Sequence, residues 1–168
     1  VAEIVDRLTD GSSKYALVRK YVELSDSDKV LEGAFRVDDV DAARFASAFW
    51  RYILVLMDYM RACEAGHFKG GVHKYLQESI FPYRTCPQGR HKPTESDTVR
   101  AGKRTREERT FRVPVEVDPR GRIEMWAHFA PTHRDQNAPR MHYYADTRNT
   151  HKVYIGYIGP HLTNTKTN

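Results

Sequence analysis

The hydrophobic residues of this chain change their spacing part-way along the sequence. Over residues 1–80 they recur every three to four positions, as on one face of an α-helix. From Thr110 onward they recur every second position, as in a β-strand with one buried face. Each half offers an apolar face that another layer must cover. The sequence therefore predicts an α+β fold, in which an N-terminal helical group packs on a C-terminal four-stranded antiparallel β-meander.

The strongest helical element carries large apolar side chains from Phe45 to Met60. They cover more than half of a helix circumference, which predicts a central helix. Its most apolar run is interrupted by Arg51 and Asp58, and is shorter than the roughly 20 apolar residues that span a bilayer. We therefore expect no membrane helix. The N-terminus has acidic residues and no apolar block, so no secretory signal is predicted and a cytoplasmic location is favoured.

Two alternating segments separated by a turn predict the first β-hairpin of the sheet. Apolar and polar side chains alternate over residues 111–117 and again over 123–129. The sequence Asp118-Pro119-Arg120-Gly121 between them is typical of a turn with proline at its second position. Further strands are expected at 140–146 and 152–158, which completes the meander.

A proline-rich and basic segment lies between the two halves. Its prolines predict a connecting loop over residues 81–109, between a helical part at 1–80 and a sheet at 110–162. We expect a single domain, which could be a fragment of a longer protein. The chain has 27 Lys and Arg residues against 22 Asp and Glu residues, a net charge of +5. Residues 84–112 hold nine basic and four acidic residues, so the whole excess lies there.

The cations of this segment predict an interface with nucleic acid, RNA being favoured over DNA. Basic side chains bind the phosphate backbone, and aromatic rings stack on unpaired bases. The expected contact residues are Arg100, Lys103, Arg104, Arg106, Arg140 and Lys152, with Trp126 and Tyr144 as stacking rings. A solvated linker is the competing interpretation, because four acids are interspersed among the cations.

Strand alternation places acid–base side chains on the sheet face opposite the helices, which we expect to be exposed. Glu124 or His128 would accept a proton, His142 would donate one, and Arg140 and Lys152 would bind the scissile phosphate. RNA supplies its own 2′-hydroxyl nucleophile, so this reaction needs no metal and no cofactor. The expected architecture is similar to that of small ribonucleases of the RelE-like toxin group. The resulting hypothesis is a metal-independent RNA-cleaving domain of toxin or defence type.

Other interpretations stay open. The polar sheet face could be an ordinary solvated surface, where cross-strand ion pairs are common. The chain could also be a non-catalytic nucleic-acid-binding or protein-interaction module of a larger protein. Zinc could bind between His128, His142 and His161, although no HxxxH, HxH or HExxH spacing is present. Cys63 and Cys86 lie too far apart for a CxxC site, and we expect both to be free thiols.

Overall fold

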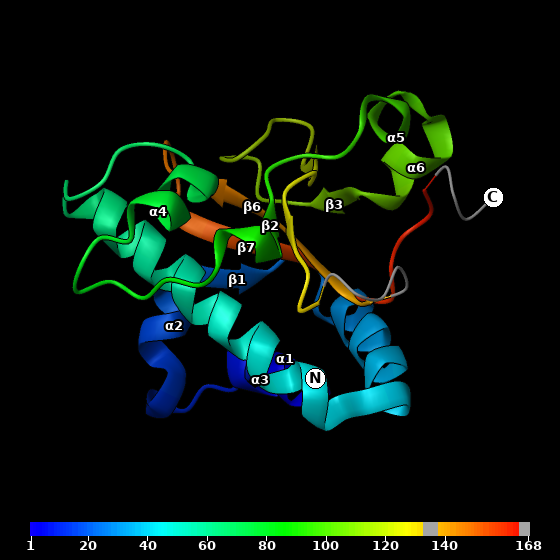
Figure 1. The fold of residues 1–168 in the computed structure, drawn as a ribbon, viewed down its shortest axis with the longest axis horizontal. Helices are drawn as coiled ribbons and strands as arrows, with labels where there is room; N and C mark the ends of the chain where they lie inside the picture. The colour runs from blue at the N-terminus through cyan, green and yellow to red at the C-terminus, as the bar shows by residue number, and fades with distance from the viewer. Residues whose placement is uncertain (133–137, 165–168) are drawn as a thin grey trace.

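The computed structural model describes residues 1–132 and 138–164, and the side chains of residues 40–43 are outside this description. The architecture is α+β, as the sequence predicts. The helices are α1 (Ala2–Thr9), α2 (Ala16–Tyr21), α3 (Ser27–Glu64), α4 (Val72–Glu78), α5 (Asp97–Ala101) and α6 (Lys103–Glu108), with 3-10 turns η1 (Ser13–Tyr15) and η2 (Gln88–Arg90). The strands are β1 (Val22–Leu24), β2 (His91–Lys92), β3 (Thr110–Arg112), β4 (Arg122–Glu124), β5 (His128–Phe129), β6 (Arg140–Asp146) and β7 (Lys152–Gly159). Figure 1 shows a central sheet with α1–α3 on one side and with β3, α5 and α6 on the other.

Helix α3 is the longest element and supplies much of the main core. Its N-terminus is capped by the side chain of Asp26, which accepts a hydrogen bond from the backbone N–H of Lys29. The apolar stretch that predicts a central helix lies in its second half, where Phe49, Ile53 and Met60 are fully buried. Figure 1 shows the helix changing direction between a short first arm and this longer second arm. Within the described residues, no helix combines the length and apolarity that crossing a membrane requires.

The central sheet has five strands in the order β1–β7–β6–β5–β2. The strands expected at 140–146 and 152–158 are β6 and β7, which pair antiparallel. β1 pairs with β7 in parallel, with Val22 opposite Val153. The sheet is therefore mixed, and the predicted four-stranded antiparallel meander is wrong in detail. β1 is not visible in the sequence because Val22 continues the helical spacing of the residues before it.

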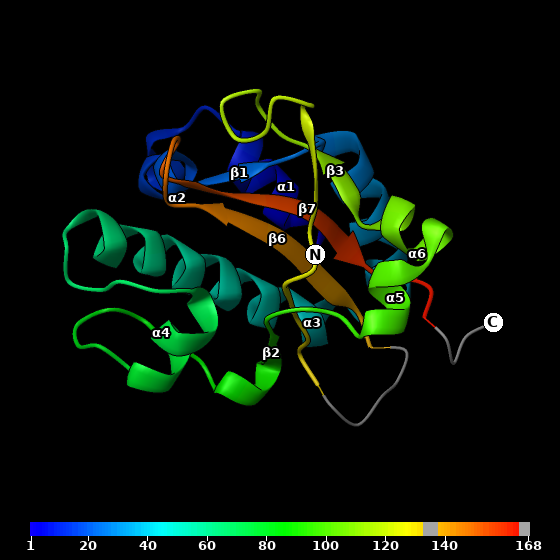
Figure 2. The ribbon, with the colours of Figure 1, turned by 90° about the horizontal axis from the view of Figure 1, so that it is seen from above.

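The first predicted hairpin is a separate two-stranded sheet of β3 and β4. It packs on the face of the main sheet that points away from α3, beside β7 in Figure 2. Val113, Met125 and Tyr154 form a small second core there, and Phe111 packs against them. Gly156 leaves room for this approach, since a Cβ at that position would collide with the ring of Phe111. The sheet face that we expected to be exposed is therefore covered.

Residues 81–109 are more ordered than the predicted connecting loop. They contain η2, the edge strand β2 and the helices α5 and α6. The Ser96 side chain caps α5 by accepting a hydrogen bond from the N–H of Val99. The Thr105 hydroxyl donates to the carbonyl of Val99 at 2.5 Å, which joins the two short helices. The prolines of this segment suggest an irregular loop. Local capping and the burial of Val99 nevertheless order it.

Candidate functional site

A buried group of polar side chains lies where β5 and β6 meet the segment before α5. His128 of β5 stands directly opposite His142 of β6, with ring centroids 4.9 Å apart. Glu95 brings a carboxylate oxygen to 3.9 Å from Nδ1 of His128. One potential ligand atom from each of these three residues lies within 4.8 Å of the other two. Glu95, His128 and His142 are named here the histidine–glutamate cluster.

Backbone carbonyls hold both imidazole rings of the cluster. Nδ1 of His128 donates to the carbonyl oxygen of Trp126, and Nδ1 of His142 donates to that of Met125, each at 3.0 Å. A carbonyl oxygen can only accept, so each Nδ1 carries the ring hydrogen and each Nε2 keeps a lone pair in the neutral ring. Among the described residues, neither Nε2 has a hydrogen-bond partner. The cluster therefore combines two ring lone pairs with one carboxylate.

Arg109 is the counter-ion of this cluster. Its side chain is fully buried, and its Nε donates to Oε1 of Glu95 at 2.7 Å. Its Nη1 donates to the carbonyl oxygen of Thr105 at 3.0 Å, while Nη2 has no partner within the part of the chain that the structure describes. Burying both charges carries a desolvation cost that offsets much of their attraction. The main effect of the pair is to fix the Glu95 carboxylate and to tie the end of α6 to the segment before α5.

Burial lowers the pKa of both cluster histidines below the usual value of 6.5. At His128 the carboxylate of Glu95 opposes this shift, because its negative charge favours the protonated ring. At His142 the positive charges of a protonated His128 and of Arg109 lower the pKa further. Both rings are therefore neutral at pH 7, and each can accept a proton or bind a cation.

The predicted catalytic residues do not share one exposed face. His128 and His142 are adjacent, but only 6% and 1% of their surfaces are exposed. The expectation that they face solvent is wrong, because β3–β4 and the α5–α6 segment pack over this side of the sheet. Glu124 lies in β4, outside the cluster, with a carboxylate oxygen 3.7 Å from the guanidinium of Arg120.

The two predicted phosphate-binding residues of the sheet lie at opposite ends of the paired strands β6 and β7. Arg140 begins β6, donates to the carbonyl oxygen of Ala138 at 2.6 Å and acts electrostatically on His128. Lys152 begins β7, opposite the last residue of β6, and its Nζ is 3.1 Å from a carboxylate oxygen of Glu23. The structure therefore keeps Arg140 near the histidines and places Lys152 elsewhere.

The predicted nucleic-acid contacts gather mainly on α5 and α6. Four exposed cations lie there, namely Arg100, Lys103, Arg104 and Arg106. Trp126 is half-buried next to the end of α6, since the N–H of its neighbour Met125 donates to the carbonyl of Arg109. Tyr144 is also half-buried but packs against the second core. The backbone next to Trp126 is therefore joined to the C-terminal end of α6.

The sequence pattern does not single out Glu95 of the cluster or its counter-ion Arg109. Glu95 meets His128 of β5 and Arg109 only after the chain has folded, so no local spacing marks either residue.

A second buried histidine group involves α4, β2 and β6. Nδ1 of His91 lies 3.0 Å from Nδ1 of His73, and its Nε2 lies 2.6 Å from the hydroxyl of Tyr143. Both ring nitrogens of His91 therefore have side-chain partners. Burial is the largest cause that lowers the pKa of His91 to about 3. His73, His91 and Tyr143 are named here the histidine–tyrosine chain.

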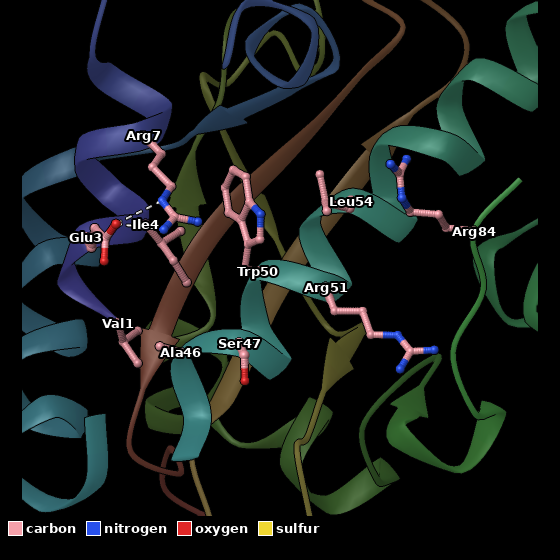
Figure 3. Close-up of a pocket in the computed structure, with 10 residues that line it drawn as sticks. All are labelled: Val1, Glu3, Ile4, Arg7, Ala46, Ser47, Trp50, Arg51, Leu54 and Arg84. Atoms are coloured by element: carbon pink, nitrogen blue, oxygen red, sulfur yellow. Dashed lines mark hydrogen bonds and ion pairs between the residues drawn. The ribbon is translucent and has the colours of Figure 1, made fainter. Parts of the chain in front are cut away.

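A pocket of about 550 Å³ lies between α1 and α3, and none of the predicted catalytic or binding residues lines it (Figure 3). Its charged side chains interact with each other and with neighbours. The Arg7 guanidinium lies 4.8 Å from the centre of the Trp50 ring and 2.6 Å from a Glu3 oxygen. Arg84, at its other end, binds the buried carboxylate of Asp58 at 3.2 Å. Among the described residues that line this pocket, there is no histidine or cysteine.

Cys63 and Cys86 are free thiols, as expected. Burial raises the pKa of Cys86 to about 11, and the positive charges of Arg51 and Arg90 counter this only in part. Burial also raises the pKa of Cys63. Neither sulfur is a thiolate at neutral pH, so neither is an activated nucleophile.

No protein-family model, curated protein or solved structure matches this chain. Its function has to be argued from its own surface and site.

Proposed function

We propose that this chain is a domain that binds single-stranded RNA through α5, α6 and the adjoining Trp126. The observation that carries the proposal is the location of the positive charge. Residues 84–112 account for the whole net charge of +5, and α5 and α6 expose four of their cations. Contacts between such cations and phosphates supply most of the affinity in sequence-independent nucleic-acid binding.

Two of these cations are in ion pairs that a phosphate group can replace. Arg100 lies 3.0 Å from Asp97, and Arg104 lies 3.2 Å from Glu108. Both guanidinium groups are largely exposed, at 48% and 77%. Exposed pairs of this kind contribute only about 0–1 kcal/mol. Exchanging the carboxylate for an RNA phosphate therefore costs little.

The proposal favours unpaired RNA because of the aromatic ring beside the basic helices. The half-exposed Trp126 lies next to the end of α6, and a stacked base needs a face that pairing and stacking in a duplex would cover. Arg106 donates to the carbonyl oxygen of Arg100 at 2.9 Å, which fixes its guanidinium at the junction of α5 and α6. The proposal places this ring and the cations of α5 and α6 on one RNA-binding surface.

Fluorescence anisotropy with a labelled single-stranded RNA tests this proposal. Arg104→Glu/Arg106→Glu should weaken binding by at least about tenfold and reduce the slope of log affinity against log salt by about 1.4, the value for two lost contacts. Lys14→Glu/Lys20→Glu is the matched control, because it makes the same charge change at exposed residues of η1 and α2. Equal weakening by both double variants would show a non-specific charge effect and reject the surface.

Metal-independent cleavage of the bound RNA is a second candidate, which the adjacency of His128 and His142 favours. A neutral imidazole can accept the proton of the 2′-hydroxyl. Because its pKa is lowered, His142 lacks the second proton of the imidazolium form at pH 7, so its proposed donor role requires acidic conditions. RNA incubated in excess chelator between pH 5 and 7, with wild type and His142→Ala, tests this activity. Equal traces of cleavage with both proteins would remove it.

A further inference from the structure

The histidine–glutamate cluster has the donor set of a metal site. Two imidazoles and one carboxylate meet from three separate segments, and their potential ligand atoms lie within 4.8 Å of one another. His128 and His142 are opposite residues of paired strands, so the sheet fixes their separation. Glu95 is fixed independently through Arg109. The geometry is thus held by backbone pairing and by a buried ion pair.

The hydrogen bonds of the rings orient their unused nitrogens. Nδ1–H of His128 donates to the carbonyl oxygen of Trp126, and Nδ1–H of His142 donates to that of Met125. In metal proteins a ligating imidazole almost always donates its other N–H to a carbonyl or carboxylate, which selects the tautomer and holds the ring. A core histidine can make one such bond for packing alone. Two adjacent rings with the same arrangement, beside a carboxylate, are what a cation requires.

The charges around the cluster set a limit on the affinity. Arg109 donates to Oε1 of Glu95, the same oxygen that lies 3.9 Å from Nδ1 of His128, so its positive charge competes with a cation for the carboxylate. Arg140 adds positive charge near His128. His161, which follows β7, interacts electrostatically with both cluster histidines and with Glu95. Its imidazole is a candidate for a fourth ligand.

We propose that Glu95, His128 and His142 bind a divalent transition-metal ion, with zinc as the ion whose ligand preferences fit best. Zinc takes imidazole nitrogen and carboxylate oxygen at about 2.0–2.2 Å, so tetrahedral ligands lie about 3.4 Å apart. The potential ligand atoms of the cluster lie within 4.8 Å of one another, so zinc binding would require them to approach by up to about 1.4 Å. Three protein ligands leave a fourth position for His161, water or a substrate oxygen. This inference does not depend on RNA binding.

Zinc titration of the chelator-stripped full chain tests the site, with calorimetry for affinity and stoichiometry. We expect one saturable zinc ion per chain. Cobalt(II) should give the visible absorption bands of a tetrahedral site. Glu95→Gln keeps an oxygen acceptor for Arg109 but loses the carboxylate, and should weaken zinc binding by more than the roughly 10–100-fold typical of residues that only support ligands. His142→Ala should abolish saturable binding.

The control is His151→Asn, which removes an exposed imidazole from the turn between β6 and β7. His151 has a φ of 53°, a conformation that asparagine tolerates. This variant should bind zinc as the wild type does. Circular dichroism of each variant identifies loss of folding, and Glu95→Gln keeps the test decisive if His142→Ala unfolds. Absence of saturable zinc binding by the wild type, or unchanged affinity in Glu95→Gln, would overturn the proposal. RNA binding measured in chelator is a separate result, so either proposal can fail alone.

Discussion

The histidine–tyrosine chain and the histidine–glutamate cluster use buried imidazoles in different ways. In the chain, both ring nitrogens of His91 are bound by side chains. In the cluster, each ring binds a carbonyl with one nitrogen and has no partner for the other among the described residues. Burial lowers the pKa of His91, His128 and His142 alike, so burial does not distinguish the two groups. The unpartnered Nε2 atoms of the cluster do distinguish them, because they leave lone pairs that a cation can use.

The largest effect that separates the two groups should come from Arg109→Met. The substitution leaves the Glu95 carboxylate, 14% exposed, without its counter-ion. Removing one partner of a buried ion pair typically costs about 3–5 kcal/mol. Urea unfolding in chelator measures this loss. Saturating zinc should restore part of it, because the metal ion then neutralises the carboxylate.

Arg104→Met is the matched control for that experiment. It removes an exposed arginine from its pair with Glu108 and should cost less than about 1 kcal/mol. An equal effect of the two substitutions would mean that Glu95 is not held as a buried charge, and the cluster would lose its anionic ligand.

Tyr143→Phe should have a smaller effect, confined to the histidine–tyrosine chain. It removes the hydroxyl 2.6 Å from Nε2 of His91 and leaves that nitrogen buried without a partner. The expected cost is about 1–3 kcal/mol in the free energy of unfolding, with zinc affinity unchanged. A parallel loss of zinc affinity would show that the two groups act as one unit.

A separate effect should appear in the pH dependence of stability. The pKa of His91 is about 3 in the folded chain against a usual 6.5, so at intermediate pH the unfolded chain binds a proton that the folded chain does not. Its contribution to stability is complete above pH 6.5 and is lost as the pH falls toward 3, at no more than about 1.4 kcal/mol per pH unit.

The double variant His91→Phe/Tyr143→Phe removes both groups of the His91–Tyr143 hydrogen bond, so only Nδ1 of the half-buried His73 loses a partner. Unfolding measured from pH 7 to 4 in chelator should show a shallower slope than the wild type. His128, His142 and His161 shift in the same direction, so part of the slope should persist in the variant. An unchanged slope would show that His91 does not contribute to the acid sensitivity.

The sequence pattern predicts strands better than it predicts their partners. The bounds of β6 and β7 agree with the expected 140–146 and 152–158 almost to the residue, because long alternating runs define a strand locally. β1 is three residues long and follows a helix directly, so its neighbours in the sequence conceal it. β3–β4 packs on the face of the main sheet, where the ring of Phe111 lies against Gly156. This approach joins residues that are distant in the sequence, so no local pattern encodes it.

In the candidate site, too, some features could be predicted from the sequence and others could not. Strand alternation is enough to suggest that His128 and His142 are neighbours, and the structure pairs them. Their burial could not be predicted, since the layer that covers them comes from β3–β4 and α5–α6. Glu95 and Arg109 form a pair because the segment between β2 and β3 folds back on itself, which the sequence does not reveal.

The parallel pairing of β1 with β7 has a consequence for how the chain is made. β1 lies near the start of the sequence and its partner β7 near the end, with Val22 opposite Val153. β1 can therefore pair only after most of the chain has been made. β7 also occupies an inner place in the sheet and lies against α3. During synthesis the apolar side of α3 therefore emerges from the ribosome long before the strand that shields it. Contacts between such distant residues slow folding and prolong the exposure of apolar surface that promotes aggregation. Production of this chain should accordingly benefit from slow expression or abundant chaperones.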